Sequence, residues 1–166
     1  MTHVREASRR WMYSRRRPNR VAALLNRGTA LVATAGIAPK RLATLEVQGR
    51  KSGRSISLPV VVAEYEGVRY LVAMLGNEAN WVRNVRAAGG KALLRHGRPE
   101  SVRLEEVDAA VRAPILQCYL QAAPGARAHF PVDRHAPLRE FEQIADEFPV
   151  FRVRATDDPT RREVSP

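Results

Sequence analysis

The sequence is poor in residues that hold small proteins together without a large core. It contains one cysteine, Cys118, among 166 residues, which excludes an internal disulfide and a cysteine-rich zinc cage. No histidine and carboxylate spacing typical of a metal site is present either, so no bound metal is predicted. A chain without disulfides fits a reducing compartment, and we expect a cytoplasmic protein.

Acidic residues are also scarce, because 17 aspartates and glutamates stand against 28 lysines and arginines, for a formal net charge of +11. A field of this sign attracts phosphate-bearing cofactors, acidic lipid or nucleic acid. Aromatic residues make up only 6% of the chain, too few for the stacking surfaces of single-strand binders. Since no helix-turn-helix, zinc-finger or ribonucleoprotein motif occurs, we expect no nucleic-acid partner.

A long apolar run is missing as well. Residues 21–38 are largely apolar, but Asn26, Arg27 and Gly28 interrupt them. A membrane-spanning helix needs about 20 predominantly apolar residues, so neither a spanning helix nor a secretory leader is predicted. Residues 1–20 carry seven arginines and one glutamate. They are either a flexible tail or a segment that contacts an acidic membrane surface, such as the inner face of the cell membrane.

The hydrophobic period changes to that of strands after residue 41, and a mainly β (α+β) domain is predicted over residues 21–155, followed by a disordered tail at 156–166. Six strands with short turns and peripheral helices indicate a small closed barrel. Pro59 interrupts the second strand, which points to an edge or a bulge there. The predicted strands are 42–48, 55–64, 68–75, 91–96, 101–107 and 149–155; the predicted helices are 80–88 with Asn80 as cap, 108–122 with Asp108 as cap, and 138–147; a loop is predicted at 124–137.

The turn Gly49-Arg50-Lys51-Ser52-Gly53 is the segment richest in chemistry. Its two glycines permit backbone angles closed to other residues, and successive N–H groups in such a turn can form an anion-binding nest. The spacing is not that of a Walker A loop. From the residues alone, the segment is an anion site or a basic hairpin turn.

This turn, Pro59, the hairpin Glu66-Gly67 and the helix Asn80-Trp81-Val82-Arg83-Asn84-Val85-Arg86-Ala87 together resemble the deazaflavin-dependent nitroreductase family. Their order and spacing match over residues 40–100. The resemblance implies a six-stranded split β-barrel related to FMN-binding barrels. It also implies coenzyme F420, a deazaflavin with a phosphate and a polyglutamate tail.

The resemblance implies a coenzyme site built from four segments. The turn would meet the phosphate and the acidic tail through charge-assisted bonds, and the second strand would supply backbone groups. The end of the third strand would flank the ring, and the helix would close the far side. The residues are, in that order, Gly49, Arg50, Lys51, Ser52 and Gly53; Ile56, Ser57, Leu58, Pro59, Val60 and Val61; Ala73, Met74, Leu75 and Gly76; Asn80, Trp81, Val82, Arg83 and Asn84. From the residues alone, Trp81 is a core anchor or a ring contact, and Arg83 and Arg86 form a solvated face.

The acceptor side departs from the family pattern. Nitroreducing members place tyrosines late in the chain, where this sequence has His129, Phe130, Asp133 and His135. Met74, Leu75 and Phe130 predict an apolar pocket wall. Histidine titrates near neutral pH, so His129 and His135 are the candidate proton donors, and ordinary surface histidines are the alternative. No catalytic residue is assigned.

The function expected from the resemblance is hydride transfer from reduced coenzyme F420 to a small electron-poor acceptor, namely a quinone, an enone or a nitroaromatic. The cofactor supplies the chemistry, and the protein supplies binding and orientation. The alternatives are an FMN-binding oxidoreductase of the same fold and a non-catalytic deazaflavin carrier. The sequence leaves open whether the protein is a monomer or a homodimer.

Overall fold

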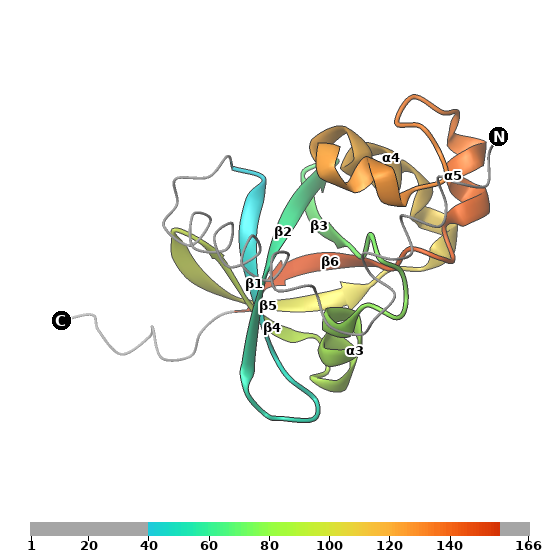
Figure 1. The fold of residues 1–166 in the computed structure, drawn as a ribbon. Helices are drawn as coiled ribbons and strands as arrows, with labels where there is room; N and C mark the ends of the chain where they lie inside the picture. The colour runs from blue at the N-terminus through green and yellow to red at the C-terminus, as the bar shows by residue number, and fades with distance from the viewer. Residues whose placement is uncertain (1–39, 157–166) are drawn as a thin grey trace.

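The computed structural model describes residues 40–156, and the barrel predicted from the sequence is confirmed. Six antiparallel strands close in the order β1-β2-β3-β6-β5-β4 (Figure 1). The segments 1–20 and 21–39 and the tail from residue 157 lie outside the described residues. The strands are β1 (Leu42–Gln48), β2 (Ser55–Tyr65), β3 (Val68–Val72), β4 (Lys91–His96), β5 (Arg98–Glu106) and β6 (Val150–Ala155); the helices are α3 (Asn80–Ala87), α4 (Ala113–Ala122) and α5 (Leu138–Ile144), with 3-10 helices η1 (Ala109–Val111) and η2 (Pro124–His129).

Two apolar clusters hold the domain together. Alternating strand residues such as Leu45, Leu71 and Phe151 fill the barrel interior, since successive side chains point to opposite faces of a strand. The second cluster joins the outer face of β2 and β3 to α4 and α5. Figure 1 shows α4 and α5 together at one side of the barrel and α3 at another, beside the turn that joins β1 and β2.

Pro59 interrupts no hydrogen-bonded ladder. It pairs with Thr44 of β1, but the flanking bonds from Gly49 N to Arg54 O and from Val62 N to Arg41 O show that even-numbered residues of β2 bond to β1. The backbone of an odd-numbered residue such as Pro59 faces the opposite edge. Its missing N–H therefore removes no bond to β1, which agrees with the predicted edge position.

Several predicted boundaries are wrong by a few residues. The third strand ends at Val72 instead of residue 75, because the chain turns away where Gly76 N bonds Ala73 O. The fifth strand begins at Arg98 instead of residue 101, since Gly97 alone makes the turn between His96 and Arg98. At the first residue of the predicted tail, Thr156 N still bonds Ser101 O, and the rest of that segment lies outside the described residues.

Helix limits differ from the predictions for similar local reasons. Asp108 caps only the short η1, where its side chain accepts from Ala110 N at 2.8 Å, and α4 follows as a separate helix. Pro124 begins the 3-10 helix η2 inside the predicted loop. The last helix ends at Ile144, three residues early. Among residues 40–156, no helix is long and apolar enough to cross a membrane.

Candidate functional site

The turn between β1 and β2 closes on itself, and two of its backbone donors have no partner in the described part of the chain. Gly49 N donates to Arg54 O and Gly53 N donates to Gly49 O, both at 2.8 Å. Gly53 has φ +67°, a conformation that favours glycine. Within residues 40–156, the N–H groups of Lys51 and Ser52 have no acceptor. These two adjacent donors match the anion nest predicted from the sequence.

Helix α3 fixes the first cation of this turn. Asn84 Oδ1 accepts from Arg50 N at 3.2 Å and from Arg50 Nη1 at 2.9 Å, and Asn80 Oδ1 accepts from Arg50 Nη1 at 3.1 Å. Asn84 is 2% exposed. The prediction that Asn80 caps α3 is wrong, because the cap is Ala79 and no side chain caps this helix. The Asn80 side chain holds Arg50 instead.

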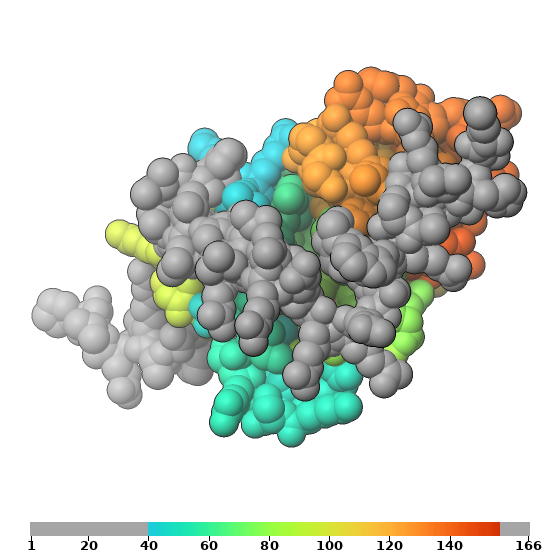
Figure 2. Space-filling view, in the orientation of Figure 1, coloured from blue at the N-terminus to red at the C-terminus, as the bar shows by residue number. Residues whose placement is uncertain are grey.

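The turn keeps its positive charge. In the described part of the chain, Arg50, Lys51 and Arg54 have no carboxylate partner. Arg83, in contrast, pairs with Glu78. These three side chains are exposed, and Figure 2 shows the segment that holds the turn at the edge of the molecule. An anion that binds here gains charge-assisted contacts without displacing a carboxylate of residues 40–156.

Gly49 sets the close packing at the base of the turn. A Cβ at this position would lie 2.8 Å from Ser52 Oγ and 2.9 Å from Ile56 Cδ1. The space beside it is a cavity of about 250 Å³, lined by Gln48, Gly49, Arg50, Gly53, Ala87 and Ala88. Cavities that enclose whole drug-sized ligands measure about 300–1,000 Å³. This one therefore has room for one end of a larger molecule and not for the whole of it.

Among the described residues, the first half of β2 has no partner strand on one of its two edges. Residues 55–61 pair with β1, whereas residues 62–65 pair with β3. Within residues 40–156, the odd-numbered positions Ser55 and Ser57 thus direct N–H and C=O groups away from any partner strand. Pro59 contributes a carbonyl to the same edge. The edge continues from the basic turn, so backbone donors and acceptors lie in line with the anion site.

The segment after β3 is pinned to the chain that precedes β6. Ala73 N donates to Pro149 O at 2.9 Å, and Gly76, with φ +80°, lies where a Cβ would be 3.2 Å from Glu147 O. The Ala73 side chain is fully buried, whereas Leu75 is 45% exposed. Of the predicted ring-flanking residues, Leu75 is therefore the one that offers an exposed apolar side chain.

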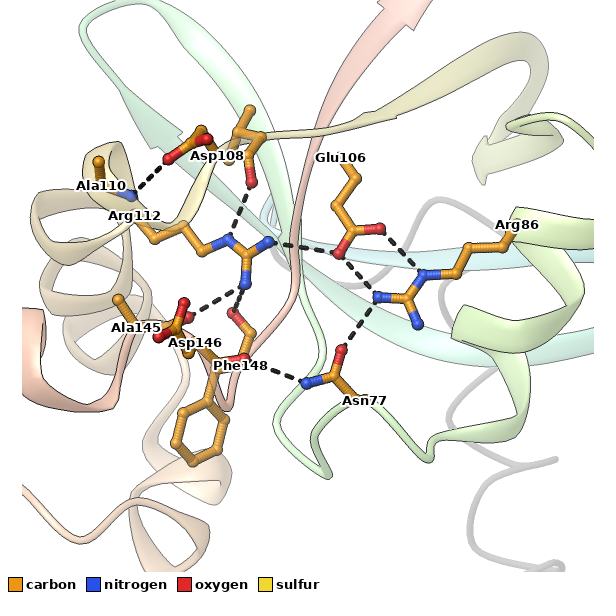
Figure 3. Close-up of polar contacts among 10 residues, drawn as sticks. Asn77, Arg86, Glu106, Asp108, Ala110, Arg112, Ala145, Asp146 and Phe148 are labelled. Atoms are coloured by element: carbon orange, nitrogen blue, oxygen red, sulfur yellow. Dashed lines mark hydrogen bonds and ion pairs between the residues drawn. The ribbon is translucent and has the colours of Figure 1, made fainter.

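A polar network joins this segment to α3 and α4, and sequence reasoning missed it. Glu106 lies between Arg86 and Arg112 (Figure 3). Its carboxylate accepts from Arg86 Nε at 2.9 Å and Nη2 at 2.8 Å, and from Arg112 Nη2 at 3.3 Å. The hydrogen bonds from Arg86 are the main reason that the pKa of Glu106 is lowered. Arg86 is thus ion-paired, while its side chain stays 41% exposed, as a solvated helix face predicts.

The remaining predicted residues divide between site and core. Trp81 packs against the barrel interior with its ring centroid 5.4 Å from that of Phe151, which fits the core-anchor interpretation. Val82 is fully buried, so its side chain is also part of the core. Phe130 stacks on Phe148 at 4.1 Å in the helical cluster, against which Met74 also packs, and its place as a pocket wall stays a prediction.

The two candidate histidines lie between α4 and α5, outside the barrel. His129 ends η2, and His135 follows in the exposed connection to α5. The ring Nε2 of His135 accepts from Arg134 Nε at 2.8 Å. Neither placement assigns a catalytic function, which stays a prediction for both residues.

Solved structures share this fold at low sequence identity. An F420-H2 dependent reductase, FDR-A, is 21% identical with a TM-score of 0.48, over 69% of this chain and 95% of that one. A chain described as a domain-swapped dimer is 20% identical with a TM-score of 0.50, over 91% and 96%. Atu2129 from Agrobacterium tumefaciens, of unknown function, is 13% identical with a TM-score of 0.52, over 75% and 52%. No curated protein matches the chain.

The sequence profile of one protein family matches residues 19–142, which include the basic turn, the β2 edge and α3. Its description is F420H(2)-dependent quinone reductase. The match confirms the resemblance of the turn and α3 motifs to deazaflavin-dependent reductases. Since it spans well over half of the chain, the protein belongs to the F420H(2)-dependent quinone reductase family and is a deazaflavin-dependent reductase.

Proposed function

We propose that this reductase binds coenzyme F420 along the basic turn and the unpaired β2 edge, and uses it to reduce a quinone. The observation that carries the proposal is the turn itself. It combines three cations without carboxylate partners, at Arg50, Lys51 and Arg54, with two unused backbone donors among residues 40–156. Such a group of donors favours phosphate and carboxylate over neutral ligands.

The residues present fit the coenzyme that the family uses. The cavity beside Gly49 has room for one anionic group, and the exposed cations can meet further carboxylates of the tail. The β2 edge offers N–H and C=O groups to the polar rim of a flat ring system. Leu75, exposed beside the predicted ring position, offers apolar contact. Arg50 would hold the phosphate end, with its orientation set by Asn80 and Asn84.

The bound coenzyme supplies a hydride to an electron-poor acceptor, and no protein nucleophile is needed. The protein's contribution is to bind and orient. The turn fixes the anionic end, and the β2 edge and residues 73–76 fix the ring end. Holding two reactants in a productive arrangement lowers the entropic part of the barrier. A quinone fits the exposed apolar side chain at Leu75 better than an acceptor that requires polar donors.

The deciding experiment is a titration of the purified protein with reduced coenzyme F420, followed by coenzyme fluorescence, and then turnover with a menaquinone analogue. We expect saturable binding that weakens as salt rises, because part of the attraction is between exposed charges. Tight coenzyme binding without turnover of any acceptor would favour the carrier alternative.

The FMN alternative is separated by colour and by competition. A protein that retains FMN after purification absorbs visible light, and added FMN would displace the deazaflavin. FMN carries a phosphate but no polyglutamate tail, so the three cations of the turn favour the deazaflavin. If FMN bound more tightly than coenzyme F420 at matched salt, the coenzyme assignment would be wrong.

A further inference from the structure

Asn77 occupies a position between three elements that the proposed coenzyme site depends on. Its Nδ2 donates to Asp146 O at 3.1 Å, and its Oδ1 accepts from Arg86 Nη2 at 3.0 Å (Figure 3). One amide side chain thus links the segment after β3 to the segment before β6 and to α3. It follows directly on Ala73–Gly76, the segment proposed to flank the ring.

The group that holds Asn77 is itself held from the core. Arg86 bonds Glu106, and Glu106 also accepts from Arg112. Arg112 is 7% exposed, and its Nη1 donates to Ala145 O at 3.1 Å and to Phe148 O at 3.4 Å. Both arms of the network therefore end on the backbone of residues 145–148. A network of hydrogen bonds between several positioned polar groups orders its members more strongly than a single surface hydrogen bond does.

Helix α3 carries both ends of this arrangement. Asn80 and Asn84 on α3 hold Arg50 of the basic turn, and Arg86 on the same helix holds Asn77. A rigid helix of eight residues thus connects the proposed anion end of the coenzyme site to its proposed ring end. The spacing of the two ends is fixed by tertiary contacts of α3 and not by the intervening loop.

We propose that Asn77 is a positioning residue, which rests on the proposed function: it sets residues 73–76 against the coenzyme ring without touching the coenzyme itself. The anionic end of the coenzyme is held elsewhere, at Arg50 and Lys51. Loss of Asn77 therefore affects the geometry of the reacting end and leaves affinity nearly intact. A small misplacement of reacting groups lowers turnover by up to about 100-fold.

The test compares Asn77→Ala and Asn77→Asp with Arg154→Gln as a matched control. Asn77→Asp keeps an acceptor for Arg86 but places a carboxylate oxygen against Asp146 O, which repels it. Arg154→Gln breaks an exposed ion pair with Glu105 that takes no part in this network. Three quantities are measured for each protein: the coenzyme dissociation constant, kcat with a menaquinone analogue, and amide hydrogen exchange without coenzyme.

For both Asn77 variants we expect kcat to fall about tenfold or more, with a dissociation constant within about threefold of the unaltered protein. Exchange should accelerate at Ala73 and Gly76, whose N–H groups bond Pro149 O and Ala73 O, but not at Gly53 in the basic turn. The control should match the unaltered protein in all three measurements.

Unchanged amide hydrogen exchange at Ala73 and Gly76 in the Asn77 variants would overturn the inference. Faster exchange that also includes Gly53 would overturn it too, because it would indicate general destabilisation of the fold. If Asn77→Asp matched the unaltered protein in kcat and in hydrogen exchange, the hydrogen bond from Asn77 to Asp146 O would not be what positions the segment. The proposed function fails separately, if the unaltered protein binds no deazaflavin. Exchange would then still report whether Asn77 orders residues 73–76.

Discussion

The Asn84 amide oxygen accepts two hydrogen bonds from Arg50, one from the backbone N–H at 3.2 Å and one from the guanidinium at 2.9 Å. A buried, neutral side chain thereby holds both the backbone of the basic turn and the guanidinium of Arg50 in place. Because the acceptor is an amide, Arg50 is oriented without being neutralised. A carboxylate at position 84 would give the same geometry and cancel the charge.

Asn84→Asp and Asn84→Ala separate these two contributions. We expect Asn84→Asp to fold with an ordered turn but to bind the deazaflavin less tightly, since the added carboxylate pairs with Arg50. Asn84→Ala leaves Arg50 N without its acceptor and should lower the stability by about 1–3 kcal/mol. Thermal unfolding and coenzyme fluorescence measure the two effects. Unweakened binding by Asn84→Asp would show that the charge of Arg50 is not used.

Lys51→Ala should weaken coenzyme binding about tenfold, corresponding to about 1.4 kcal/mol for one exposed charge-assisted contact. The dependence of the dissociation constant on salt should also become shallower. Lys40→Ala is the control, because this exposed lysine precedes β1 at the end opposite to the turn. Equal dissociation constants for the two variants would place the anionic tail elsewhere.

Gly89 and Gly90 form a matched pair for a test of packing after α3. Both have positive φ, +63° and +83°, but only at Gly90 would a Cβ meet the backbone, at 2.5 Å from Leu104 O. Gly89→Ala should cost about 1 kcal/mol of stability from backbone strain alone. Gly90→Ala should cost about 1–3 kcal/mol more, because the bond from Leu104 N to Gly90 O must shift. Chemical denaturation of both variants measures the difference, and equal losses would contradict it.

The Arg69–Glu100 pair gives a pH-dependent contribution to stability. The Arg69 guanidinium bonds both carboxylate oxygens, at 2.8 and 2.6 Å, and lowers the pKa of Glu100. The pair therefore stabilises the fold above the unfolded pKa of about 4.3, and this is lost as the pH falls through the lower folded pKa. Both side chains are more than a third exposed, so the effect is below about 1 kcal/mol.

Glu100→Gln should accordingly lower the melting temperature at pH 7, and the difference from the unaltered protein should close below about pH 4. Glu105→Gln, which breaks the more exposed pair with Arg154, serves as the comparison. A difference that persists unchanged to pH 3 would mean that the loss has a cause other than the charge of Glu100.

Quinones should be reduced faster than bicyclic nitroimidazoles. Leu75 offers exposed apolar surface, whereas nitro oxygens require donors. Steady-state rates with a menaquinone analogue and a nitroimidazole, at equal reduced coenzyme, provide the comparison. Leu75→Ser should lower the ratio of the quinone rate to the nitroimidazole rate. Faster nitroimidazole turnover by the unaltered protein would indicate donors in the pocket, and His129 and His135 would be the first to replace.

The sequence by itself determined the barrel and the basic turn. Strand periodicity is a local property, so β1, β4 and β6 lie at or within a residue of their predicted bounds. The turn residues also follow from local chemistry, because Gly53 has a positive φ and a Cβ at Gly49 would force Ser52 and Ile56 to shift. The order and spacing of the turn and helix motifs along the chain were enough to recognise the family.

Tertiary structure alone decided which polar side chains meet. Asn80 fits the local pattern of a helix cap, but its oxygen accepts from Arg50, 30 residues earlier. The stacking of Phe130 on Phe148 likewise joins two segments that lie apart in the chain. Glu106 and Arg112 carry no motif, and their function in holding Arg86 and residues 145–148 depends on a strand end, two helices and a loop coming together. Contacts between distant segments have no local signature, because they arise from packing rather than from backbone preference.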